Sequence, residues 1–132
     1  MKNLILISLL FVCTFVNAQF SVSTNFRQDA TWNVAEEKWE VFSTDEKGTL
    51  FEFNKELTTF RHITESITSD YFIKEFDYND EKVLYTLTVT SDAGNEYEMM
   101  IDGLNECVAF FYWRDDVYYL VRHTIKASWI RE

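Results

Sequence analysis

The stretch CVAFFYWRDDVYYLV, residues 107–121, decides the fold class of this chain. Two runs rich in aromatic and β-branched residues flank the charged triplet 114–116, which is typical of a β-hairpin with a polar turn. The first run carries no charged side chain on either face, so protein or ligand is expected to cover both faces. We therefore expect an interior strand here, or one whose outer face is covered by Trp129 and Ile130.

Period-two alternation, the mark of half-buried strands, continues toward the N-terminus. Its clearest example spans residues 83–90, where one face carries Val83, Tyr85, Leu87 and Val89. The same pattern predicts shared faces for Tyr97, Met99 and Ile101, for Phe60 with His62, and for Phe72, Phe76 and Tyr78.

The turns between these runs predict an all-β fold. The chain has three glycines, each in an expected turn, and no proline. Strand signals recur at the spacing typical of a β-sandwich or β-barrel. Because the connections are short, sequence neighbours are expected to pair in the sheet. We predict an antiparallel up-and-down meander of eight or nine strands, forming a small barrel or a strongly curved sheet. A two-layer β-sandwich is the alternative.

The N-terminal segment predicts export. Lys2 precedes an apolar run that ends near Ala18, as in a Sec-type signal peptide of residues 1–18. Residues 19–132 then form one β domain, placed in the periplasm or outside the cell. That domain holds a single cysteine, Cys107, so no disulfide within the chain is expected. Its apolar setting predicts a buried residue rather than a reactive thiol.

Charge excludes some partners. The formal net charge is −10, which argues against nucleic acid and anionic membrane surfaces and favours a basic partner, if any. The apolar run in 1–18 is too short for a membrane span.

No motif predicts catalysis, a metal or a cofactor. The two histidines, His62 and His123, and Cys107 lack the spacing of zinc ligands, and no nucleophile elbow or phosphate loop is present. His123 alternates with apolar residues, which predicts a core histidine with satisfied hydrogen bonds. We expect a protein that is not an enzyme.

The aromatic content, 17% of the chain, is the unusual component. Most of these rings are expected to fill a core, since aromatic residues suit pleated, half-buried surfaces. The remainder predict a binding module with an aromatic-lined cavity or face for a small apolar ligand, because an eight-stranded barrel can just enclose one. A surface for a protein or envelope partner is the alternative. The candidate ligand-binding residues are Phe111, Trp113, Tyr119, Tyr112, Arg122 and Trp39.

A small exported meander with an early Trp and an Arg in its last strand is similar to lipocalins and their barrel relatives. Trp32 or Trp39 would supply the Trp, and Arg122 the Arg. The resemblance implies a barrel. The chain departs from that family at the Gly two residues before the Trp, where it has Ala30 or Glu37.

Overall fold

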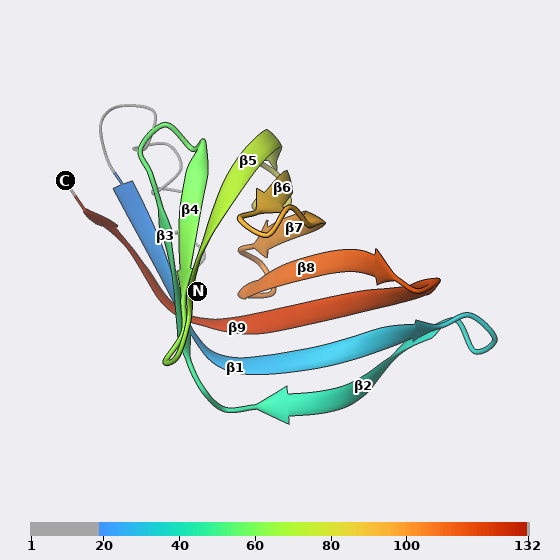
Figure 1. The fold of residues 1–132 in the computed structure, drawn as a ribbon. Helices are drawn as coiled ribbons and strands as arrows, with labels where there is room; N and C mark the ends of the chain where they lie inside the picture. The colour runs from blue at the N-terminus through green and yellow to red at the C-terminus, as the bar shows by residue number, and fades with distance from the viewer. Residues whose placement is uncertain (1–18, 132) are drawn as a thin grey trace.

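The computed structural model describes residues 19–131 and arranges them as nine antiparallel strands in one sheet (Figure 1). The predicted signal peptide, 1–18, lies outside the described residues. The strands are β1 (Gln19–Asn33), β2 (Lys38–Asp45), β3 (Thr49–Phe53), β4 (Thr59–Ile63), β5 (Thr68–Asn79), β6 (Leu84–Ser91), β7 (Glu96–Asp102), β8 (Cys107–Arg114) and β9 (Val117–Arg131).

The sheet closes on itself because β1 pairs with β9 along almost its whole length. Eight strands form a barrel in the order β1, β3, β4, β5, β6, β7, β8, β9, and β2 adds to the outside of β1 as a ninth. This confirms the predicted all-β antiparallel meander and decides for the barrel over the sandwich. The hairpin arm β8 pairs on both sides, with β7 and β9, so it is an interior strand as predicted.

One connection departs from the simple meander. β2 and β3 follow each other in sequence, yet they do not pair with each other. Both pair with β1 instead: β3 with residues 20–24 and β2 with residues 27–33. The expectation that every pair of sequence neighbours would form a hairpin is therefore wrong at this point, because β1 is long enough to serve two partners in succession.

The change of partner coincides with a bend in β1. Its pairing with β9 shifts register on both sides of Thr24, as at a β-bulge. The Thr24 hydroxyl lies 3.0 Å from the Thr49 hydroxyl and accepts a hydrogen bond from the Thr49 backbone N–H. Gly48 passes so close that a Cβ atom there would stand 2.4 Å from the Thr24 carbonyl oxygen. Residues 46–48, which connect β2 to β3, are thus held against the bend in β1.

Beyond this bend the sheet leaves the barrel as an open, four-stranded extension (Figure 1). The extension consists of β2 with residues 27–33 of β1, 117–122 of β9 and 111–114 of β8. At its tip, β8 and β9 are joined by Asp115 and Asp116, both with positive φ, as a tight hairpin requires. Among residues 19–131, β2 pairs only with β1, so its other side is a free sheet edge in this part of the chain.

The barrel interior is filled by large side chains. Phe51 has no exposed surface and contacts the ring of Phe60 on the neighbouring strand β4 and that of Phe110 on β8, across the barrel. The predicted inward faces of β6 and β7 are confirmed, since Tyr85, Leu87, Val89, Met99 and Ile101 are all buried. A filled interior is the form that an eight-stranded barrel takes when it holds no ligand inside.

Two predicted faces need correction. Phe72 does not share a face with Phe76 and Tyr78, because β5 shifts register between Ile73 and Glu75. A one-residue shift moves side chains to the other face of a strand, so Phe72 points outward and is exposed. Val83 lies in the turn before β6, at a φ of 49°.

Candidate functional site

The outer face of the extension carries five aromatic rings in contact. We call this set the outer aromatic cluster: Trp32, Trp39, Phe111, Trp113 and Tyr118. The ring of Trp39 lies 5.2 Å from that of Trp32, 6.0 Å from that of Phe111 and 5.6 Å from that of Tyr118. Tyr118 in turn stacks on Trp113 at 4.7 Å. Cross-strand pairs such as Trp32 with Trp39 and Trp113 with Tyr118 place these rings on one surface.

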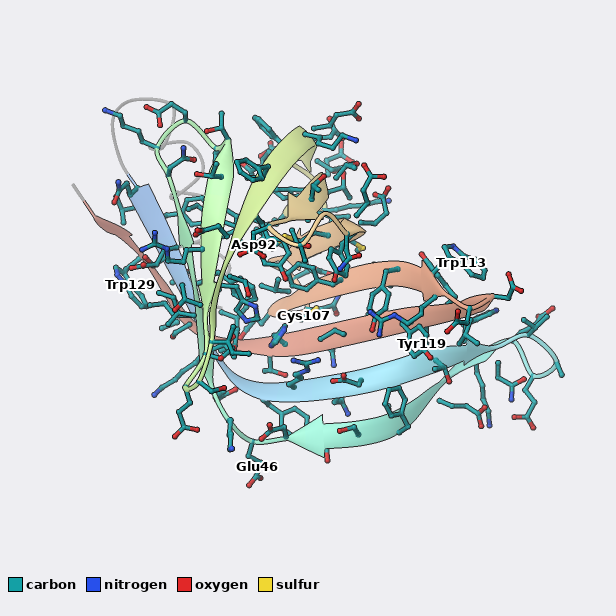
Figure 2. The ribbon with its side chains drawn as sticks, in the orientation of Figure 1. Glu46, Asp92, Cys107, Trp113, Tyr119 and Trp129 are labelled. Carbon is teal, nitrogen blue, oxygen red and sulfur yellow. The ribbon has the colours of Figure 1, made fainter. Side chains whose placement is uncertain are left out.

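No second layer of the described chain covers this cluster. Trp113 is 69% exposed, and Val41, which pairs with Ala30 beside the cluster, is 51% exposed. Figure 2 shows Trp113 at the end of the extension that is remote from the barrel. An exposed apolar patch of this kind, beside a free strand edge, is a candidate interaction surface.

The inner face of the extension continues the barrel interior. Tyr112 and Tyr119 stack there at 5.1 Å, and the Arg114 guanidinium lies 5.4 Å from the Tyr112 ring centre. Phe42, the extra residue at the bulge of β2, packs edge-on against Tyr119 and remains 61% exposed. The two faces therefore carry separate aromatic groups.

The six predicted site residues divide between these faces. Phe111, Trp113 and Trp39 belong to the outer aromatic cluster, whereas Tyr112 and Tyr119 face inward. Phe111 and Trp113 thus do not line the interior. The prediction omitted Trp32 and Tyr118. Alternation along β8 separates Phe111 and Trp113 from Phe110 and Tyr112, and a two-residue turn at 115–116 would have paired Tyr118 with Trp113 on the same face.

The sixth residue, Arg122, pairs with Ala109 on the outer side and contacts Cys107. Burial raises the pKa of the Cys107 thiol, and a hydrogen bond with Arg122 opposes this shift in part. A thiol with a raised pKa is a weak nucleophile. The structure therefore places Cys107 as a buried residue, as predicted.

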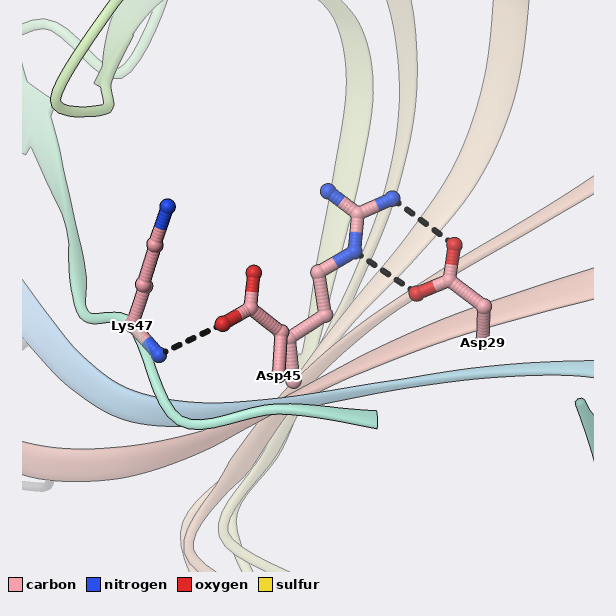
Figure 3. Close-up of polar contacts among 4 residues, drawn as sticks. Asp29, Asp45 and Lys47 are labelled. Atoms are coloured by element: carbon pink, nitrogen blue, oxygen red, sulfur yellow. Dashed lines mark hydrogen bonds and ion pairs between the residues drawn. The ribbon is translucent and has the colours of Figure 1, made fainter. Parts of the chain in front are cut away.

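A small cavity of about 130 Å³ opens where the barrel meets the inner face of the extension. Its aromatic lining comes from Tyr71, Tyr97, Phe110 and Tyr112, and its polar lining from Arg27, His62 and His123. Arg27 forms a two-pronged ion pair with Asp29, with Nε 2.7 Å from Oδ1 and Nη2 2.9 Å from Oδ2 (Figure 3). Beside this pair, the Lys47 backbone N–H donates to Asp45 (Figure 3).

The two histidines come together from strands that are not neighbours. Their ring centres are 5.5 Å apart, and both rings contact Phe51. Burial lowers the pKa of His62 to about 4 and that of His123 to about 3, and the positive charge of Arg27 adds to both shifts. Both imidazoles are therefore neutral at pH 7.

These histidines are not fully satisfied. His62 Nε2 and His123 Nδ1 are buried and have no hydrogen-bond partner among residues 19–131. The prediction that His123 is a core residue is confirmed, since it is only 1% exposed, but its satisfied hydrogen bonding is not. An unpaired buried nitrogen costs about 1–3 kcal/mol, so this corner of the barrel is energetically unusual.

A larger hollow of about 480 Å³ lies over β3, β4 and β5. Its charged groups include the exposed ion pair of Arg61 and Asp70, with Nε 3.2 Å from Oδ1. Charges that already neutralise each other at the surface give little reason to expect a ligand.

Within residues 19–131, no group of three or more His, Cys, Asp or Glu side chains is arranged to hold a metal ion. The same part of the chain contains no helix that is long and apolar enough to cross a membrane. No family model, curated protein or solved structure matches the chain, so its fold and site stand on their own geometry.

Proposed function

We propose that this protein is an exported, non-enzymatic binding module, and that the outer aromatic cluster is its contact surface for a protein partner. The observation that carries the proposal is the uncovered state of the cluster, with Trp113 exposed on 69% of its surface. Trp and Tyr dominate the energetics of protein interfaces, where their rings fill pockets on the partner. Large side chains fill the barrel interior, which favours a binding site on the outer surface rather than an interior site for a small apolar ligand.

The charges around the cluster suggest the chemistry of the partner. The outer face itself presents mainly aromatic and aliphatic side chains, while the end of the extension holds four acids, Glu36, Glu37, Asp115 and Asp116, against two bases, Lys38 and Arg114. Lys38 pairs with Glu36 at 3.3 Å, which leaves this end net acidic. An apolar centre with an acidic rim suits a partner that has an apolar pocket and a basic rim. Such a rim mainly raises the rate of association and its dependence on salt.

The free edge of β2 offers a second mode of contact beside the rings. An extended segment of the partner that paired with β2 would gain backbone hydrogen bonds while its side chains reached Val41 and Trp39. The acidic rim and the free edge lie on the same extension, so one partner can use both.

The test is capture from the producing cell with matched variants. The native protein and Phe72→Ala, which removes an exposed ring from the barrel wall, should retain the same partner. Trp113→Ala combined with Trp39→Ala should lose it. Equal capture by the double variant, or no capture by the native protein, would contradict the proposal. A dimer by light scattering that the double variant dissociates would instead identify a second copy as the partner.

A further inference from the structure

We propose that the cavity at the barrel mouth binds a small, uncharged ring compound that carries both a hydrogen-bond donor and an acceptor. The cavity measures about 130 Å³. Liquid water occupies about 30 Å³ per molecule, so this is space for about four waters. One ring of a few heavy atoms fits such a volume, whereas a long acyl chain does not. This site is separate from the outer aromatic cluster and does not depend on it.

The walls of the cavity favour a flat ligand. The rings of Tyr71 and Tyr97 meet edge-on at 6.1 Å, and Tyr97 meets Tyr112 in the same way at 5.3 Å. Phe110 closes the group, with its ring centre 6.1 Å from those of both Tyr71 and Tyr97. Edge-to-face and stacked contacts are the arrangements that aromatic rings prefer, and a planar ligand ring can extend this set.

The polar groups at the cavity supply unused hydrogen-bonding capacity. Within the described part of the chain, His62 Nε2 and His123 Nδ1 have no hydrogen-bond partner. None of the hydrogen bonds found among residues 19–131 uses the hydroxyl of Tyr71, Tyr97 or Tyr112. A neutral imidazole has one N–H donor and one acceptor nitrogen, and a phenol can donate or accept. The site therefore suits a ligand edge that presents both kinds of group.

The charge balance selects against an ionised ligand. Arg27 is the one cationic side chain lining the cavity, and its guanidinium is already neutralised by Asp29 through two short hydrogen bonds. Asp45 also acts on Arg27 and adds further negative potential. A carboxylate ligand would have to displace Asp29, and a cationic ligand would meet Arg27. An uncharged ligand avoids both costs.

The test follows the histidine nitrogens by NMR in the ¹⁵N-histidine-labelled protein at pH 7, while three one-ring probes are added separately. The probe of the proposed class is 2-pyridone, which has adjacent N–H and C=O groups. Benzene has the same ring without polar atoms, and benzoate adds a negative charge. We expect saturable shifts of the His62 and His123 nitrogens with 2-pyridone, and weaker or no shifts with the other two. Stronger binding of benzoate or benzene, or no shift with 2-pyridone at its solubility limit, would overturn the proposal.

Hydroxyl deletions test the assignment without removing a ring. Tyr97→Phe and Tyr112→Phe should each weaken 2-pyridone binding about three- to tenfold, the loss expected for one hydrogen bond. Tyr118→Phe makes the same change in the outer aromatic cluster and should leave this binding unaltered, as should Trp113→Ala. Unchanged affinity in both Tyr97→Phe and Tyr112→Phe, with the fold intact by circular dichroism, would rule out the site. The capture experiment tests the outer aromatic cluster, and the probe titration tests the cavity. A failure to capture a protein partner would therefore not change the conclusion about the cavity.

Discussion

The barrel and the extension share the two long strands β1 and β9, yet they differ in how far their aromatic side chains are buried. In the barrel, Phe51 is fully buried, whereas Phe42 and Trp113 in the extension are mostly exposed. The difference comes from closure. A closed sheet covers its own inner face, but an open one needs a second layer, and residues 19–131 leave Trp113 uncovered on the outer face and Phe42 uncovered on the inner face. Similar residues are therefore buried in one region and left accessible to solvent in the other.

The largest expected effect tests this contrast directly. Phe51→Ala should lower the free energy of unfolding by about 3–5 kcal/mol, because it leaves a cavity among packed rings. Phe42→Ala, a matched change in the extension, should cost less than about 1 kcal/mol. Urea denaturation of the two variants measures both values. Similar losses would show that the extension is as tightly packed as the barrel.

Acid should weaken the barrel through its histidines. The pKa values of His62 and His123 in the folded protein, about 4 and about 3, lie below the ordinary value of 6.5. The unfolded chain therefore takes up protons first as the pH falls. The contribution of the neutral histidines is complete above about pH 6.5 and declines toward the folded values, with a loss on the order of 3 kcal/mol for His62 alone.

The measurement is urea stability between pH 7 and pH 5, above the range in which most carboxylates titrate. Replacing both histidines by Gln should flatten the slope over this interval. An unchanged slope would assign the acid sensitivity to other groups.

A single substitution at Gly48 tests the bend in β1 that separates the barrel from the extension. Gly48→Ala would bring a Cβ within 2.4 Å of the Thr24 carbonyl oxygen, and both groups belong to backbone that is held by hydrogen bonds. We expect a loss of about 1–3 kcal/mol and faster amide exchange in β2. Gly94→Ala places its Cβ where nothing lies within 4 Å, although the φ of 87° at this turn makes the change strained, so it should lower overall stability without a selective increase of exchange in β2. Intact protection in Gly48→Ala would mean that the connector does not hold the extension.

The smallest effect lies in the turn between β1 and β2. Glu37 adopts a φ of 53° and is exposed, so Glu37→Gly should stabilise the protein by about 0.5–1 kcal/mol through relief of strain. Glu36→Gly, at a neighbouring residue without positive φ, should instead be neutral or destabilising. Thermal unfolding distinguishes the two. A gain in both variants would point to loss of negative charge instead.

Local pattern was enough to predict much of the fold. Alternation identified the inward faces of β6 and β7, and hairpin spacing identified the meander. Alternation predicted the wrong face for Phe72, because the pairing of β5 with β6 shifts register between Ile73 and Glu75. Local pattern also failed where one strand serves two partners, because the length of β1 is decided by what packs beside it.

The candidate site was predicted in part. Composition indicated the aromatic hairpin, but the division of Phe111 and Tyr112 between faces needed the position of the barrel interior. The convergence of His62 on His123 could not be predicted from sequence. These residues lie on β4 and β9, which do not pair, and they meet across the barrel only because of its closure and stagger.

The pairing of β1 with β9 has a consequence for the order of folding. Its register joins Gln19 to Arg131 and Thr31 to Tyr119, so the contacts that close the barrel link segments from the two ends of the described chain. Contacts of such high sequence separation give a high contact order, and chains of this kind fold slowly because the entropy of closing a long loop is lost before the contacts form. The hairpins from β3 to β8 can form locally first. We therefore expect the pairing of β1 with β9 to form late, and to join the β1–β2 and β8–β9 hairpins into the extension.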